Sequence, residues 1–183
     1  MSVFEFTATL FGIVVALAMA RTLGGVADII RYRKEIRHKP LFLIWFSLLL
    51  LGNVVWWFSL WRLSESDVVS LYQFGMAFLV PVCFFIATRL LVPDVSDFTA
   101  IGERYRGVRV PFLLTLAIPF FPGPILAGVF TSEWSIGAYL LPAGMILVAG
   151  TLSSNVRFQY GVAISVTVIY LAFAMQFRSS IGG

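Results

Sequence analysis

Long apolar stretches separated by short polar connections dominate this chain of 183 residues. An α-helix rises about 1.5 Å per residue, so roughly 20 apolar residues cross the ~30 Å hydrocarbon core of a bilayer. The pattern therefore predicts an all-α fold, a polytopic membrane helix bundle that forms one domain over residues 1–183. Stretches of the required length predict six spans, near residues 3–24, 41–61, 68–91, 110–130, 134–152 and 158–177.

Composition supports a membrane location. Hydrophobic residues make up 60% of the chain and charged residues only 12%, whereas soluble domains carry roughly 25% charged residues. The charges are clustered between the apolar stretches, which leaves more apolar sequence than one soluble core needs.

Prolines interrupt the fourth predicted span. Pro119, Pro122 and Pro124 lie close together, with Gly123 before the last of them. Each proline removes a backbone donor and obstructs the preceding helical turn, so we expect the span to break or kink from Pro119 to Pro124. Two interpretations stay open: a broken helix at membrane depth, of the kind that builds solute sites in transporters, or an ordinary loop near the outer surface.

Orientation follows from the basic residues, because Lys and Arg beside spans are retained in the cytoplasm. In a bacterial plasma membrane both termini are then expected outside and the three basic connections inside. The expected cytoplasmic residues are Arg31, Arg33, Lys34, Arg37 and Lys39, then Arg104, Arg106 and Arg109, and finally Arg157.

The first basic connection is also expected to contact anionic lipid headgroups, each cation contributing about 1 kcal/mol near such a surface. No nucleic-acid recognition motif accompanies it, so we expect membrane lipids as partners and no nucleic acid. The lipid-contacting residues are Arg31, Arg33, Lys34, Arg37 and Lys39.

Small residues recur every four positions in the first span and predict a ridge that another helix can approach closely. We favour packing within the chain's own bundle; the alternative is an interface between subunits of a homo-oligomer or larger membrane complex. The ridge consists of Ala8, Gly12, Ala16, Ala20 and Gly24.

Asn53 lies near the middle of the second span, where an unpaired amide is costly. Thr167 and Tyr170 lie at a similar depth in the sixth span. We expect these three side chains to form a small polar cluster inside the membrane. A hydrogen bond between helices that fixes packing is favoured over a solute site.

Asp94 and Asp97 form a cluster of acids, with Glu103 after them. A carboxylate pair at this spacing suggests Mg²⁺ and phosphoryl chemistry. The pattern departs from that of the CDP-alcohol phosphotransferases, because Phe98 stands where a glycine is needed and no second acid pair follows. We therefore favour a solvated loop and predict no metal site.

Missing residue types exclude several functions. The only lysines are Lys34 and Lys39, which leaves no intramembrane amine for a retinal Schiff base. His38 and Cys83 are each the sole residue of their type, which excludes bis-histidine haem, cysteine metal clusters and the usual triad hydrolases. No cofactor and no catalytic residue is predicted.

Three functions follow from these patterns, in order of preference. The first is a pathway or binding site for a small solute, lipid or ion in an oligomer, using the fourth-span break and Asn53. The second is a non-catalytic accessory or scaffold subunit of a larger membrane complex, packed through its 18 Phe, 6 Tyr and 5 Trp. The third is a lipid-modifying enzyme that uses Asp94 and Asp97.

Overall fold

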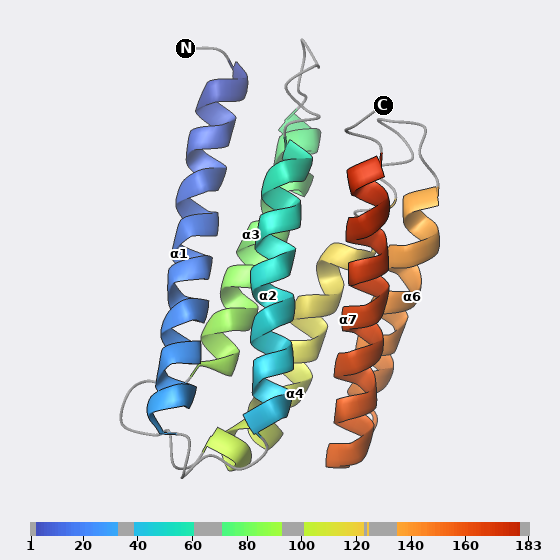
Figure 1. Ribbon diagram of the computed structural model, residues 1–183. Coiled ribbons are helices and arrows are strands. Elements are labelled where there is room, and N and C mark those ends of the chain that lie inside the picture. Colours follow the sequence, from blue (N-terminus) through green and yellow to red (C-terminus); the bar gives the residue numbers. More distant parts are fainter. Residues whose placement is uncertain are drawn as a thin grey trace.

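The computed structural model describes residues 3–32, 39–60, 71–92, 101–122, 124 and 135–179. Within these ranges the secondary structure is helical, and successive helices run up and down the bundle so that both termini lie at the same end (Figure 1). The elements are α1 (Val3–Arg31), α2 (Lys39–Leu60), α3 (Leu71–Leu91), α4 (Ile101–Ala117), the 3₁₀ turn η3 (Ile118–Phe120), α6 (Ser135–Gly150) and α7 (Val156–Ser179).

Four helices are long and apolar enough to cross a membrane, which identifies the chain as a multi-pass integral membrane protein. The apolar segment of α6, Tyr139–Gly150, is shorter. α4 has 17 residues and is therefore only about 25 Å long. The six-span count thus stays a prediction. The four candidate spans are Ala8–Arg31, Pro40–Phe58, Phe74–Leu91 and Val156–Met175.

Two predicted boundaries are corrected by the helix ends. α1 continues beyond the predicted end of the first span and includes Arg31. α4 begins at Ile101, so Arg104, Arg106 and Arg109 lie in a helix and not in a connection. Charge alone does not end a helix, because an arginine side chain can reach polar groups at the helix surface while its backbone stays helical.

The α4 break lies inside the bundle. The regular helix ends at Ala117 and the chain tightens into η3, where Pro119 and Phe120 are buried. The chain is helical again at Pro122 and Pro124, of which Pro124 is buried, whereas Gly123 lies outside the described residues. In Figure 1 the upper end of α4 stops well short of the upper ends of α2 and α7. These observations favour the buried-break interpretation over a loop at the outer surface.

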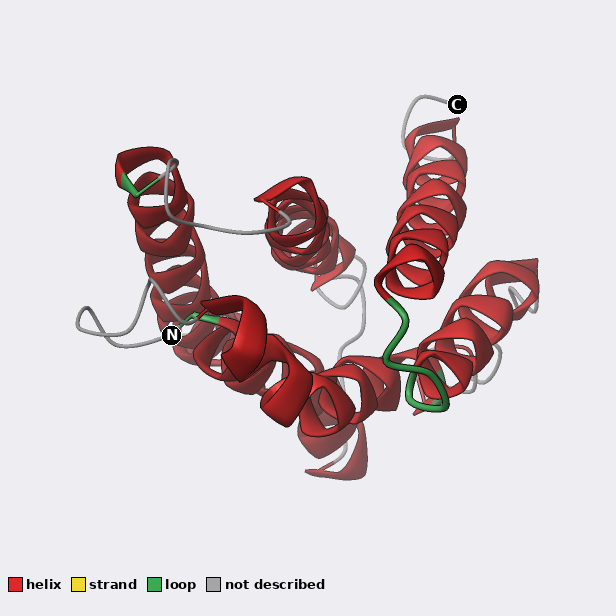
Figure 2. Cartoon of the chain, turned by 90° about the horizontal axis from the view of Figure 1, so that it is seen from below, coloured by secondary structure: helices red, strands yellow, loops and turns green. Residues whose placement is uncertain are grey.

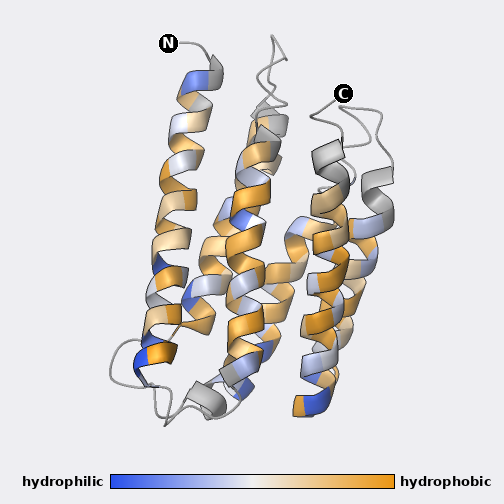
Figure 3. Ribbon diagram, viewed as in Figure 1, coloured by the Kyte–Doolittle hydropathy of each residue, from blue (hydrophilic) through white to orange (hydrophobic). Residues whose placement is uncertain are grey.

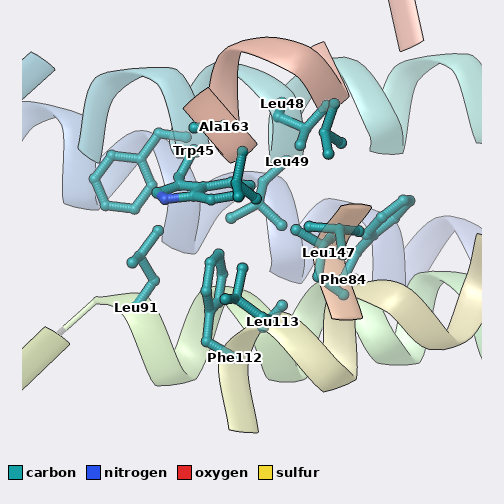
Figure 4. Packing of buried hydrophobic residues seen from close by; sticks show 14 of the residues in the cluster. Trp45, Leu48, Leu49, Phe84, Leu91, Phe112, Leu113, Leu147 and Ala163 are labelled. Atoms are coloured by element: carbon teal, nitrogen blue, oxygen red, sulfur yellow. The ribbon is translucent and has the colours of Figure 1, made fainter. Parts of the chain in front are cut away.

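One aromatic-rich core connects the helices, which lie in more than one layer around it when seen along the bundle (Figure 2). At its centre the Trp45 ring of α2 meets the Phe112 ring of α4 edge-on, with centroids 5.2 Å apart. Figure 4 shows Leu91 and Leu113 beside this pair. Each buried aromatic ring contributes a large apolar area, so these contacts set how α2, α3 and α4 pack.

Glycines occur where helices approach most closely. A Cβ at Gly25 of α1 would lie 2.7 Å from Val92, and one at Gly52 of α2 would lie 2.9 Å from Phe84 of α3. Real Cβ contacts are longer than this, so a side chain at either position would force Val92 or Phe84 to move.

Candidate functional site

The buried α4 break is surrounded by aromatic and small residues of neighbouring helices. The Phe120 ring packs edge-on against the Tyr170 ring of α7, with centroids 5.9 Å apart. A Cβ at Gly144 of α6 would lie 3.0 Å from the Phe120 Cβ, so α6 packs directly against the break. The structure thus brings together the proline-rich segment and Tyr170, which the sequence patterns assign to two different candidate sites.

Asn53 is fully buried in α2 but makes no hydrogen bond to another helix. Its side-chain Nδ2 donates to the Leu49 carbonyl of its own helix at 2.8 Å, and its Oδ1 has no partner among the described residues. Thr167 likewise donates to Ala163 of its own helix at 2.7 Å. No hydrogen bond in the described part of the chain joins Asn53 to Thr167 or Tyr170, so the interhelical bond favoured from sequence is not formed there.

The predicted small-residue ridge turns mostly away from the bundle. Ala16, Ala20 and Gly24 are exposed in the single chain. A Cβ at Gly24 would meet nothing within 4 Å, and only Gly12 makes a close contact, with Trp57. Packing within the chain's own bundle is therefore wrong for Ala16, Ala20 and Gly24. The half-buried Ala8 and Gly12 lie closer to the bundle.

The buried face of α1 lies beside the ridge and carries a polar contact to α3. The hydroxyl oxygens of Thr22 and Thr88 are 3.1 Å apart, and each also lies within hydrogen-bonding distance of a carbonyl of its own helix. The two hydroxyl groups have only two protons for three possible hydrogen bonds. The pair therefore fixes the relative position of α1 and α3 more than it stabilises their contact.

The basic connection and the acid pair fall largely outside the described residues. Arg33, Lys34, Arg37, Asp94 and Asp97 all lie there, and so does the side chain of Lys39. Arg31 is exposed, with its guanidinium carbon 5.5 Å from the centre of the Tyr32 ring. The described residues contain no group of three or more His, Cys, Asp or Glu arranged to hold a metal.

A polar network at the basic end of the bundle was missed by the sequence analysis. Two of its members, Tyr105 and Arg109, lie on the buried face of α4. The same face continues at helical spacing through Phe112 and Leu116. That spacing was visible in the sequence, but the arginines there were assigned to a connection. Figure 3 shows hydrophilic segments at this end, opposite the termini.

Gln159 of α7 organises the network. Its Oε1 accepts a hydrogen bond from the Tyr105 hydroxyl at 3.0 Å. Its Nε2 donates to the carbonyl oxygens of Gly150 at 2.8 Å and Ser153 at 2.7 Å, at the C-terminal end of α6. Carbonyls at a helix end lack donors within the helix, so Gln159 caps α6 and connects it to α4 and α7.

Arg109 is 9% exposed and only partly satisfied. Its Nη2 donates to the Thr151 carbonyl at 3.1 Å, where the negative end of the α6 dipole favours a cation. Its Nε and Nη1 are buried and have no partner in the described residues. A buried guanidinium with two unpaired nitrogens is energetically costly unless an acceptor faces it.

Trp45 lies beside Tyr105 in the same region. Its indole Nε1 interacts with the Tyr105 hydroxyl oxygen, which can accept from it, although the pair does not reach standard hydrogen-bond geometry. Tyr105 also packs edge-on against Phe42, with centroids 5.5 Å apart. Arg109 is therefore the member of this network whose donors lack an acceptor.

Comparisons with protein-family models, with curated proteins and with solved structures find no significant match to this chain.

Proposed function

We propose that this multi-pass membrane protein contributes a pathway or binding site for a small solute, lipid or ion, with the α4 break and Asn53 as its polar elements, and that it acts as an oligomer. The observation that carries the proposal is the burial of Pro119, Phe120 and Pro124 inside the bundle. A departure from regular α-helix at membrane depth, here the 3₁₀ turn Ile118–Phe120, is tolerated where protein or a water-filled cavity satisfies the freed carbonyls.

Unpaired polar groups of both kinds occur in α2 and α4. Pro119 has no N–H, so the Thr115 carbonyl loses its usual donor four residues on. In α2 the Asn53 Oδ1 is a buried acceptor and the Trp56 Nε1 is a buried donor, and neither has a partner in the described part of the chain. An acceptor and a donor one helical turn apart suit a ligand that both donates and accepts hydrogen bonds. We therefore expect a small polyol more than a simple anion or cation.

Cysteine accessibility tests the proposal. Cys83 is the only cysteine, so Cys83→Ala gives a background without thiols. In this background Asn53→Cys should react with a small membrane-permeant thiol reagent in intact membranes, because a pathway has to admit water or solute to this position. Leu49→Cys, one turn away and also fully buried, should stay unlabelled.

Leu152→Cys provides the control for the labelling chemistry, because Leu152 is 86% exposed. Labelling of Leu152→Cys together with a complete lack of labelling at Asn53→Cys would contradict a pathway at this level.

A scaffold subunit is the second candidate, supported by the exposed ridge of α1. Ala16, Ala20 and Gly24 present close-packing positions that the chain's own helices do not use. This function predicts that the protein copurifies with a larger membrane partner under mild extraction. A stable homo-oligomer purified alone would favour the pathway instead.

For orientation, we propose that the termini face outward and the opposite end of the bundle faces the cytoplasm. Support comes from the shared end of the two termini (Figure 1) and from the exposed Arg31, Arg106 and Arg157 near the helix ends opposite them. Cations beside spans are retained on the cytoplasmic side.

A further inference from the structure

The Arg109 guanidinium is a permanent positive charge held inside the bundle. Arginine carries five N–H donors and does not deprotonate in proteins. The one hydrogen bond it makes in the described residues, to the Thr151 carbonyl, uses a single donor. Nε and Nη1 remain without an acceptor although the side chain is only 9% exposed. Its surroundings therefore require an acceptor that brings negative charge.

Neighbouring oxygens are not placed to serve Arg109. The Gln159 Oε1 accepts from Tyr105, and the Gly150 and Ser153 carbonyls accept from Gln159. None of these oxygens makes a hydrogen bond to the Arg109 Nε or Nη1 in the described residues.

Charges in the described side chains do not balance Arg109 either. The acids whose side chains are described, Glu5 and Asp28, both belong to α1, whereas Arg109 bonds to the turn between α6 and α7. Glu103 belongs to α4, but its side chain lies outside the described part of the structure. Arg106, three residues earlier in α4, is exposed and adds a further cation near the surface.

We propose that Arg109 binds a phosphate group at the basic end of the bundle, either the phosphate of an anionic phospholipid or free inorganic phosphate. A phosphate carries negative charge and several acceptor oxygens. It can therefore accept hydrogen bonds from both Nε and Nη1 of the Arg109 guanidinium. The site is separate from the α4 break and does not depend on the pathway proposed there.

The test uses the full chain, purified in detergent and stripped of lipid. The thermal unfolding midpoint is measured with added phosphatidylglycerol, with phosphatidylcholine and with inorganic phosphate. If only phosphatidylglycerol raises the midpoint, the bound phosphate belongs to a lipid. If inorganic phosphate raises it, the site binds the free anion. No rise with either anionic addition, or an equal rise with phosphatidylcholine, overturns the proposal.

Matched variants locate the site. Arg109→Gln should weaken the apparent affinity for the effective anion by about tenfold or more, because charge-assisted hydrogen bonds are lost. Arg106→Gln removes the same charge from an exposed position of the same helix and should change the affinity much less. Equal losses in the two variants would mean that only surface charge matters and would overturn the assignment.

An internal carboxylate is the competing explanation. Asp94→Asn, Asp97→Asn and Glu103→Gln should each leave the anion effect intact. If one of them lowers the unfolding midpoint as much as Arg109→Gln, and the double variant lowers it no further, Arg109 pairs with that acid and the proposal fails.

Two further measurements apply if Arg109→Gln does not fold. Arg109→Lys keeps the charge but loses the planar donor geometry, and it should bind the anion more weakly than the natural chain. Native mass spectrometry of the unstripped natural chain should show a bound anionic lipid if the lipid is the source. Unchanged binding in Arg109→Lys would contradict recognition by the guanidinium.

Discussion

Gly24 and Gly25 are neighbours in α1 with opposite surroundings. A Cβ at Gly25 would lie 2.7 Å from Val92 and 3.0 Å from Phe46, whereas a Cβ at Gly24 would meet nothing within 4 Å. The packing of α1 against α2 and the end of α3 therefore depends on a single missing side chain at position 25.

Substituting these two glycines separately measures that dependence. Gly25→Ala should lower the free energy of unfolding by about 1–3 kcal/mol, the usual cost of overpacking a filled interior. Gly24→Ala should leave it unchanged or raise it by up to about 1 kcal/mol, because alanine is the better helix former. Thermal or chemical unfolding in detergent provides the measurement, and equal effects of the two changes would contradict the α1 packing described here.

This pair also explains why the predicted ridge was assigned to the wrong contact. Four-residue spacing identifies small residues on one helix face, but every helix has several faces. Burial selects the neighbouring face, which carries Phe11, Val15, Ala18 and Thr22. The neighbours that make this choice come from α2 and α3, so α1 alone does not contain the information.

At the scale of elements, α4 is joined to α7 by the hydrogen bond from Tyr105 to Gln159. The same glutamine caps the end of α6 through Gly150 and Ser153. Three helices therefore meet at one buried side chain.

Removing one hydroxyl tests this connection. Tyr105→Phe leaves the buried Gln159 Oε1 without its donor and should lower the free energy of unfolding by about 1–3 kcal/mol. Tyr170→Phe is the matched control, since the Tyr170 hydroxyl makes no hydrogen bond in the described residues, and it should have a smaller effect. The comparison uses unfolding in the same detergent, and a larger loss for Tyr170→Phe would contradict the assignment.

The two ends of α4 also show how far sequence predicts an element. Proline chemistry predicts the break near Pro119 because a missing N–H acts locally. The start at Ile101 was missed because three arginines resemble a connection. The Arg109 side chain can be buried because α6 ends beside it and offers the Thr151 carbonyl.

For the whole molecule, the proposed orientation makes the turn between α6 and α7 cytoplasmic. In the Cys83→Ala background, Leu152→Cys should react with a membrane-impermeant maleimide in inside-out vesicles and not in intact cells, because Leu152 is 86% exposed in that turn. Ser2→Cys should show the reverse pattern. Labelling of both positions from the same side would contradict the odd number of crossings that the proposed orientation places between them.

The sequence by itself determined that this chain is helical and that it is a membrane protein. Both conclusions rest on properties of single segments: the length of an apolar run, the scarcity of charge within it and the missing donors of prolines. Tertiary structure decided which face of α1 is covered, that the α4 break lies inside the bundle, and that Arg109 is buried with Trp45 nearby. These outcomes depend on where other helices lie, because burial and hydrogen bonding are relations between segments and not properties of any one of them.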